Sequence, residues 1–118
     1  MANLTQAQVQ IIITLYNSGK MLETIDAIKV LSKDHPNVPL LFNIMGACYK
    51  ALLQLNDAKE MFEKAIKVKP DYAEAHYNFG VILHELGQFD NAIIAYKKAI
   101  ALVPNYPDAH NNLGIIFL

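Results

Sequence analysis

Cysteine is nearly missing from this chain of 118 residues, which contains only Cys48. A single cysteine cannot form an intrachain disulfide, and no zinc site can be built from cysteine pairs. The sequence also lacks a glycine-rich phosphate loop and a helix with two zinc-binding side chains four residues apart. We therefore expect neither a metal ion nor a cofactor.

An excess of charge of one sign is missing as well, because 10 basic and 11 acidic residues give a net charge of −1. Proteins that bind nucleic acid or anionic membranes normally carry a basic excess, so we expect neither partner. The N-terminus has no basic segment, and the early apolar run Ile11-Ile12-Ile13 is too short for a signal core or a membrane span. The sequence predicts a soluble, cytoplasmic chain.

Apolar residues are abundant and make up 53% of the chain, whereas charged residues contribute 18%. Disordered chains combine low hydrophobicity with high net charge, so this composition predicts a folded protein. The length fits a single domain.

A period of 34 residues runs through the sequence. Gly46, Gly80 and Gly114 keep this spacing, and residues 39–72 and 73–106 share nine identities when aligned without gaps. An internal repeat of this length is typical of a solenoid built from stacked supersecondary units.

Within each unit, apolar residues recur every three or four positions, which indicates amphipathic helices. Pro70 and Pro104 cannot extend the helices before them, while Gly19 and Gly87 suit a left-handed turn after the first helix of a pair. The pattern predicts seven helices, at about 4–17, 21–33, 39–52, 56–68, 72–86, 90–102 and 106–118.

The unit resembles the tetratricopeptide repeat (TPR), with a phenylalanine in place of the usual tryptophan. Its pattern in residues 39–72 is Phe42-x2-Met45-Gly46-x2-Tyr49, followed by Ala58, Phe62, Ala65 and Pro70. The resemblance implies an all-α domain, a right-handed TPR solenoid of antiparallel helix pairs. It would contain a degenerate repeat 1 at 5–38, repeat 2 at 39–72, repeat 3 at 73–106 and a partial repeat 4 at 107–118.

Small residues in this pattern predict close helix contacts. We expect Gly46 and Ala58 to face each other where the two helices of one repeat approach. Phe62 is expected to fill the gap between repeats, since a helix pair cannot bury its apolar faces alone.

The side chains that could support catalysis have simpler explanations. Cys48 corresponds to Ile82 and Ile116 in the next repeats, so we expect a buried, inert thiol. His76 and His110 are 34 residues apart, and we expect their ring nitrogens to reach solvent or a backbone carbonyl. The sequence predicts no catalytic residue and no enzyme.

The resemblance makes the concave face the informative surface, because in this family the first helix of each repeat forms it. Helical-repeat proteins that bind RNA need basic side chains there, and this chain has almost none. We expect a protein or peptide partner to contact Tyr16, Asn17, Asn43, Lys50, Glu74, Tyr77, Asn78, His84, Glu85, Asn111 and Asn112.

Chaperone-binding TPR domains clamp a C-terminal carboxylate with lysine, asparagine and arginine side chains on this face. Here Val9 and Ile13 replace the lysine and asparagine of the first repeat, and Glu74 and Asn78 replace the lysine and arginine of the third. The clamp is therefore not expected in this chain.

Asn78 and Asn112, one repeat apart, resemble instead the asparagine ladder of O-linked N-acetylglucosamine transferase, in which amides hold the backbone of an extended peptide. An amide suits this role because it is both donor and acceptor. Ile44 interrupts the ladder in repeat 2.

The sequence thus predicts an interaction scaffold that binds a peptide or partner segment in a concave groove. Two alternatives stay open: a substrate-presenting fragment of a larger glycosyl- or sulfotransferase-like enzyme, and a self-assembling structural array. The sequence stops inside a fourth repeat, which favours a fragment.

The last predicted helix has no second helix to pack against within this sequence. Natural arrays end in a polar capping helix, and an uncapped apolar end promotes association. We therefore expect a homodimer that forms through Leu113, Ile115, Ile116, Phe117 and Leu118.

Overall fold

The computed structural model describes residues 3–117, and every regular element in this range is an α-helix. The predicted bounds agree with the observed ones to within two residues, while Leu118 lies outside the described range. The seven helices of this range are α1 (Gln6–Asn17), α2 (Met21–Ser32), α3 (Pro39–Ala51), α4 (Leu55–Val68), α5 (Ala73–Glu85), α6 (Phe89–Leu102) and α7 (Pro107–Ile116).

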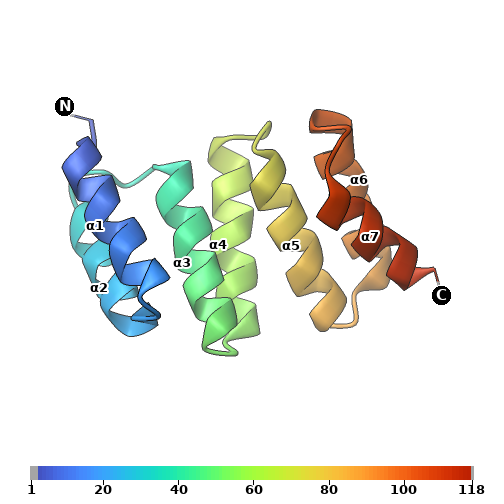
Figure 1. The fold of residues 1–118 in the computed structure, drawn as a ribbon, viewed down its shortest axis with the longest axis horizontal. Helices are drawn as coiled ribbons and strands as arrows, with labels where there is room; N and C mark the ends of the chain where they lie inside the picture. The colour runs from blue at the N-terminus through green and yellow to red at the C-terminus, as the bar shows by residue number, and fades with distance from the viewer. Residues whose placement is uncertain (1–2, 118) are drawn as a thin grey trace.

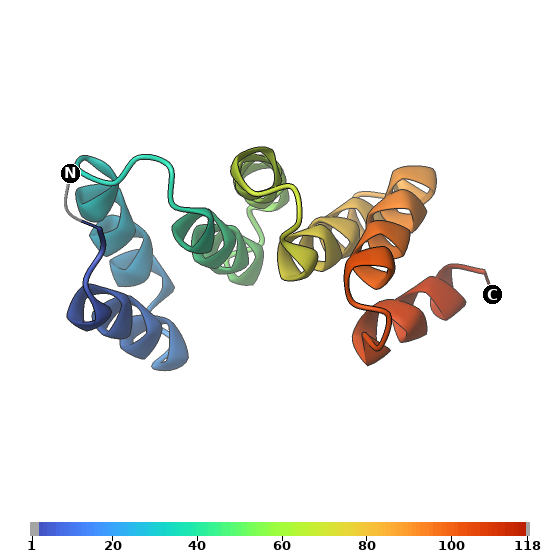
Figure 2. The ribbon, with the colours of Figure 1, turned by 90° about the horizontal axis from the view of Figure 1, so that it is seen from above.

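The helices form antiparallel pairs that stack side by side into a solenoid measuring 44 × 27 × 21 Å (Figure 1). Seen from above, the solenoid is curved, with α1, α3, α5 and α7 on its inner side and α2, α4 and α6 on its outer side (Figure 2). Each helix contacts the next one in the chain, and α3 also contacts α5. The all-α solenoid is therefore confirmed, and its first helices form the concave face.

The buried side chains cluster where helices of neighbouring repeats meet. Ile12, Ile28 and Leu41 form a cluster that joins α1, α2 and α3. A second cluster joins α5, α6 and α7 around Leu83 and Tyr96. The fold therefore depends on stacking between repeats as well as on the pairing within them.

Within a repeat, a glycine packs closely against an aromatic ring. A Cβ atom on Gly46 would lie 2.5 Å from Cε1 of Phe62, and one on Gly80 would lie 2.7 Å from Cε1 of Tyr96. The Phe62 ring therefore supplies the atoms nearest to Gly46, and the expected approach of Gly46 to Ala58 stays a prediction. Phe62 also packs with Ile82, so it fills the gap between repeats as predicted.

The turn between the two helices of a repeat requires a left-handed residue. Gly19 and Gly87 have φ values of +76° and +77°, as predicted from the sequence. Leu53 occupies the equivalent position in repeat 2 with φ of +60°, and its side chain is 81% exposed. A non-glycine residue in this conformation costs about 1–2 kcal/mol.

We expect Leu53→Gly to raise the free energy of unfolding by about 0.5–1 kcal/mol. Glycine removes the left-handed penalty, but its greater freedom in the unfolded chain offsets about 0.4–1 kcal/mol of that gain. Urea denaturation followed by circular dichroism measures the change. The reverse substitution, Gly87→Leu, should destabilise, and a lower unfolding midpoint for Leu53→Gly would contradict the prediction.

Candidate functional site

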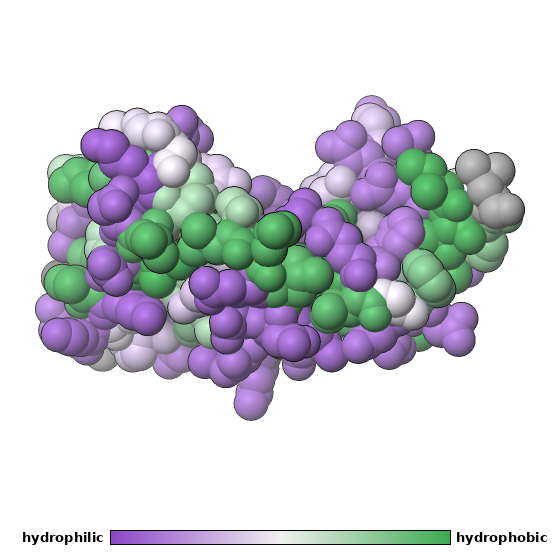
Figure 3. All heavy atoms as spheres, turned by 90° about the horizontal axis from the view of Figure 1, so that it is seen from below, coloured by the Kyte–Doolittle hydropathy of each residue, from purple (hydrophilic) through white to green (hydrophobic). Residues whose placement is uncertain are grey.

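A groove of about 490 Å³ opens on the concave face where α1, α3 and α5 lie next to one another. In a view from below, the surface is hollowed between the two ends of the solenoid (Figure 3). The lining includes five of the predicted contact residues, namely Tyr16, Asn43, Lys50, Glu74 and Asn78. The groove thus draws polar side chains from three repeats to one place.

Apolar side chains also line this groove, among them Ile44, Ala47 and Leu53. Leu53 was not predicted as a groove residue because it lies in a turn rather than on a helix face. Its alignment with Gly19 and Gly87 marks Leu53 as a turn residue but does not place it beside the groove. The groove can therefore contact apolar as well as polar groups of a ligand.

The remaining predicted contact residues lie outside the lining of this groove. Asn17 is the last residue of α1, and Asn111 lies on α7; both are exposed, as is Glu85. The others are half-buried: Tyr77, His84 and Asn112.

The asparagine amides of the concave face connect neighbouring repeats. Asn78 Nδ2 donates to Asn43 Oδ1 at 3.0 Å, and Asn112 Nδ2 donates to the Tyr77 hydroxyl at 3.1 Å. Both bonds join residues 35 positions apart, so the second is the first shifted by one repeat. The amide donors predicted to hold a peptide therefore already hold the repeats together.

Asn43 is the most enclosed of these amides, with 4% of the residue exposed. Its Nδ2 donates to the Tyr72 hydroxyl at 3.4 Å and to Glu74 Oε1 at 3.3 Å, while its Oδ1 accepts from Asn78. Asn43 therefore fixes the junction between repeats 2 and 3 and offers little surface to a ligand.

We expect Asn43→Val to lower the free energy of unfolding by about 1–2 kcal/mol, because it leaves the half-buried Asn78 amide without its partner. The equivalent positions of repeats 1 and 2 hold the apolar pair Val9 and Ile44. The double variant Asn43→Val/Asn78→Ile should therefore recover most of the loss. Denaturant unfolding of the unchanged chain and the two variants tests this, and a double variant no more stable than Asn43→Val would contradict it.

Tyrosine side chains gather at the end of the concave face nearest α7. The rings of Tyr77 and Tyr106 stack with centroids 5.1 Å apart, and those of Tyr77 and Tyr96 are tilted with centroids 5.9 Å apart. Burial, followed by the nearby Glu74, Tyr77 and Asp108, raises the pKa of Tyr106 to about 12. The Tyr106 hydroxyl is therefore neutral at physiological pH.

Two contacts connect further predicted residues to neighbouring helices. Lys50 on α3 and Glu85 on α5 form a partly exposed ion pair with an N–O distance of 4.0 Å. The rings of His84 and Phe89 form a T-shaped contact across the α5–α6 turn, with centroids 5.5 Å apart. An exposed ion pair contributes little to stability, so Lys50 and Glu85 can exchange their partners at low cost.

The side chains considered for catalysis are either buried in the core or hydrogen-bonded to the backbone. Cys48 is fully buried, and desolvation raises the pKa of its thiol to about 11 despite a hydrogen bond with Thr24 that lowers it. A thiol that stays protonated at neutral pH is a poor nucleophile. His76 and His110 donate from Nε2 to the carbonyl oxygens of Pro70 and Pro104 at 2.8 and 2.9 Å, as predicted.

The described residues form neither a metal site nor a membrane-spanning helix. Residues 3–117 contain no group of three or more histidine, cysteine, aspartate or glutamate side chains placed to hold a metal ion. No helix in that range is both long enough and apolar enough to cross a membrane.

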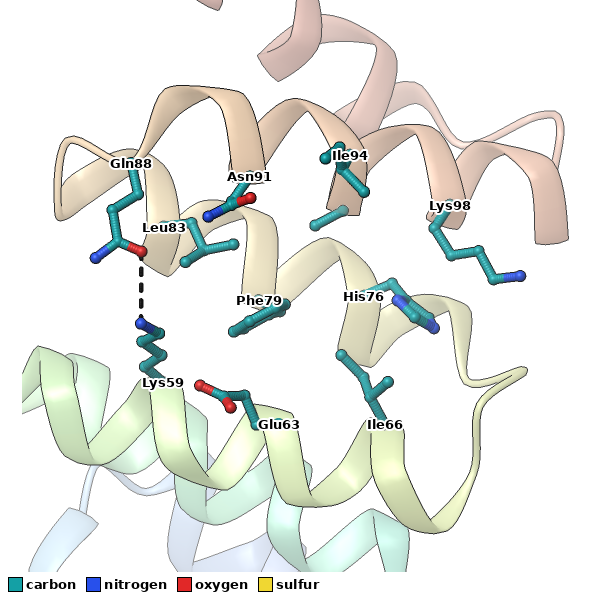
Figure 4. A pocket seen from close by; sticks show the side chains of 11 residues that line it. Lys59, Glu63, Ile66, His76, Phe79, Leu83, Gln88, Asn91, Ile94 and Lys98 are labelled. Carbon is teal, nitrogen blue, oxygen red and sulfur yellow. Dashed lines mark hydrogen bonds between the residues drawn. The ribbon is translucent and has the colours of Figure 1, made fainter.

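A second groove, also of about 490 Å³, lies among α4, α5 and α6 on the outer part of the solenoid (Figure 4). Phe79, Leu83 and Ile94 provide its apolar surface. Lys59 Nζ donates to Gln88 Oε1 at 3.4 Å across one end. This groove draws on two repeats, whereas the concave one draws on three.

Comparison with known families gives a match to the model described as TPR repeat, over residues 49–87 and 80–118. Among curated proteins, the peroxisomal targeting signal receptor of Candida glabrata is 27% identical over 77 residues, which are 65% of this chain. The receptor of Candida albicans is 28% identical over 80 residues, or 68% of the chain. These alignments cover only 13% and 14% of the receptors' own length.

Solved structures with the same fold include MamA, with a TM-score of 0.88 and 23% identity over 93% of this chain and 64% of that one. The first TPR of Spaghetti (RPAP3) bound to the HSP90 peptide SRMEEVD has a TM-score of 0.89 and 23% identity, covering 93% and 87% of the two chains. The second TPR domain of human RPAP3 in complex with the HSP70 peptide SGPTIEEVD has a TM-score of 0.87 and 18% identity, covering 94% and 92%. At these identities the likeness is one of fold.

Proposed function

The chain belongs to the tetratricopeptide repeat family, and from this premise we propose that it is an interaction module whose concave groove binds an extended segment of a partner protein. The partner in this proposal is a protein or peptide, bound without catalysis, and neither nucleic acid nor a membrane. A cytoplasmic location is part of the same proposal.

The observation that carries the proposal is the groove across α1, α3 and α5. A peptide that lies along it reaches three repeats at once, with Ile44 and Leu53 available to apolar side chains and Lys50 and Glu74 to polar ones. Two domains of the same fold are solved with peptides, which supports this use of the architecture.

The ligand differs from the acidic peptides of those two complexes. Some TPR domains hold an acidic C-terminus with a carboxylate clamp. At the clamp positions, this chain has Val9 and Ile13 in the first repeat and Glu74 and Asn78 in the third. A carboxylate at Glu74 repels a peptide that ends in acidic residues. The proposed partner is therefore not an acidic C-terminus.

Phage display of random heptapeptides against the chain tests the proposal, with two variants for counter-selection. Ala47→Arg places a long side chain in the concave groove, and Ile94→Arg places the same side chain in the outer groove. We expect selected peptides to lose binding to Ala47→Arg and to keep it with Ile94→Arg. The opposite pattern would move the binding site to the outer groove and overturn the proposal. Circular dichroism confirms that both variants fold.

Self-association through α7 stays a prediction. Within the described residues, Ile115 and Phe117 are 49% and 67% exposed, and burying one such side chain stabilises by roughly 1.5–3 kcal/mol. We expect light scattering at tens of micromolar protein to give the mass of a dimer, which Phe117→Asp splits. A monomer of 13.2 kDa would contradict the prediction.

A further inference from the structure

Charge is divided unequally between the two layers of the solenoid. The inner helices α1, α3, α5 and α7 carry three carboxylates, Glu74, Glu85 and Asp108, and one lysine, Lys50. The outer helices α2, α4 and α6 carry six carboxylates and six lysines. The small net charge of the whole chain therefore hides an acidic concave face beside a balanced convex one.

The one lysine of the inner helices is already paired. Lys50 lies 4.0 Å from Glu85, whereas Glu74 and Asp108 form no ion pair with any residue in the range 3–117. The described partner of Glu74 is the neutral amide of Asn43. Two carboxylates of the concave face are thus left to attract a cation from outside the chain.

The field of these carboxylates extends over the tyrosines around them. Burial is the largest cause of the raised pKa of Tyr72, Tyr77 and Tyr106. Glu74 raises the pKa of Tyr72 and Tyr106 further, and Asp108 does so for Tyr77 and Tyr106. Among the described residues, the charged side chains that shift the pKa of Tyr77 and Tyr106 are therefore carboxylates.

In repeat 2, the tyrosine at the position equivalent to Tyr106 already contacts a cation. Lys69 Nζ lies 5.1 Å from the ring centroid of Tyr72, which is the geometry of a cation–π contact. One repeat later, Tyr106 corresponds to Tyr72, but Val103 stands in the place of Lys69. Tyr106 thus keeps the aromatic ring and the nearby carboxylates but has no lysine of its own repeat over it.

We infer that the α5–α7 end of the concave face binds a basic side chain, arginine or lysine, of an extended cationic peptide. Glu74 and Asp108 supply the countercharge, and the stacked rings of Tyr77 and Tyr106 supply the aromatic surface. This inference rests on the proposed function, because it names the class of peptide that lies along the concave face, and Glu74 belongs to both this site and the groove. Charge complementarity decides between ligands here, since like charges across an interface are strongly disfavoured.

Three labelled peptides of equal length test the inference by fluorescence anisotropy: amidated and acetylated SLRKLRS, SLQQLQS and SLEELES. We expect the basic peptide to bind about tenfold more tightly than the neutral one at low salt, and the acidic one to bind more weakly still. The advantage of the basic peptide should shrink as salt is added, because salt screens exposed charges.

Substitutions of single carboxylates test whether Glu74 and Asp108 cause the preference for the basic peptide. Glu74→Gln and Asp108→Asn should each weaken the basic peptide by about three- to tenfold and leave the neutral peptide unchanged. Asp90→Asn is the matched control, because Asp90 is also a first-turn carboxylate but lies on the outer helix α6. An equal loss with Asp90→Asn would show attraction to the chain as a whole and overturn the inference.

The outcomes separate this inference from the function on which it rests. If the neutral or acidic peptide binds as well as the basic one and loses binding to Ala47→Arg, the groove binds peptides but not basic ones, and the inference alone fails. If none of the three peptides binds, the inference fails as well. The proposed function is then tested separately, by the phage-display selection of random peptides.

Discussion

Replacement of Phe62 by alanine is expected to lower the free energy of unfolding by about 3–5 kcal/mol. The ring is 1% exposed, lies against Gly46 of its own repeat and packs with Ala58 and Ile82. Its removal takes apolar surface out of the core and leaves a cavity that touches two repeats. Since a single domain is stable by only about 5–15 kcal/mol, a large part of the total would be lost.

Phe89→Ala is the matched control for this prediction. It makes the same chemical change at the first residue of α6, where the ring is 50% exposed. Removal of a half-exposed ring leaves no closed cavity, so we expect a loss of about 1 kcal/mol or less. Denaturant melts of the two variants measure the difference, and equal losses would mean that Phe62 does not join the repeats.

The period of 34 residues predicted most of this fold. Because Gly46, Gly80 and Gly114 repeat in register with the prolines, the helix bounds followed to within two residues without knowledge of any contact. The same period predicted the histidine contacts. His76 and His110 are one repeat apart, and each donates a hydrogen bond to a proline carbonyl six residues earlier. Local features that recur in the sequence recur in the structure.

Contacts between repeats were harder to predict. The concave residues were placed on the right helices, but the amide of Asn43 was expected to face a ligand and is buried against the next repeat. The pairing joins residues 35 positions apart, so it depends on how far each helix pair is offset from the one before it. The sequence period does not contain that offset.

Two local features were also missed, for different reasons. Thr5 and Gln8 form a capping box at the start of α1, with reciprocal bonds of 3.1 and 2.9 Å, and their spacing in the sequence was a sufficient signal. Leu53 adopts a left-handed conformation that leucine disfavours, and only its alignment with Gly19 and Gly87 indicates this. A residue whose local preference opposes its conformation is predictable from the repeat but not from its own type.

Gly46→Ala adds a single methyl group, and we expect it to lower the free energy of unfolding by about 1–3 kcal/mol. The new Cβ would lie 2.5 Å from Cε1 of Phe62 and 2.8 Å from its Cδ1 and Cζ, well inside van der Waals contact. The ring is almost fully buried, so it cannot move away without disturbing repeat 3. This cost exceeds the gain of about 1 kcal/mol that alanine brings to a helix interior.

Gly114→Ala makes the same change at the equivalent position of α7, where no atom lies within 4 Å of the added Cβ. We expect a stabilisation of about 0.5–1 kcal/mol there, so two equivalent glycines should respond with opposite signs. In the Phe62→Ala background the ring is gone, and Gly46→Ala should become neutral or stabilising, which a double-mutant cycle measures as a coupling between the two sites. If the cost of Gly46→Ala persists without the ring, the helix backbones rather than Phe62 limit the approach of α3 and α4.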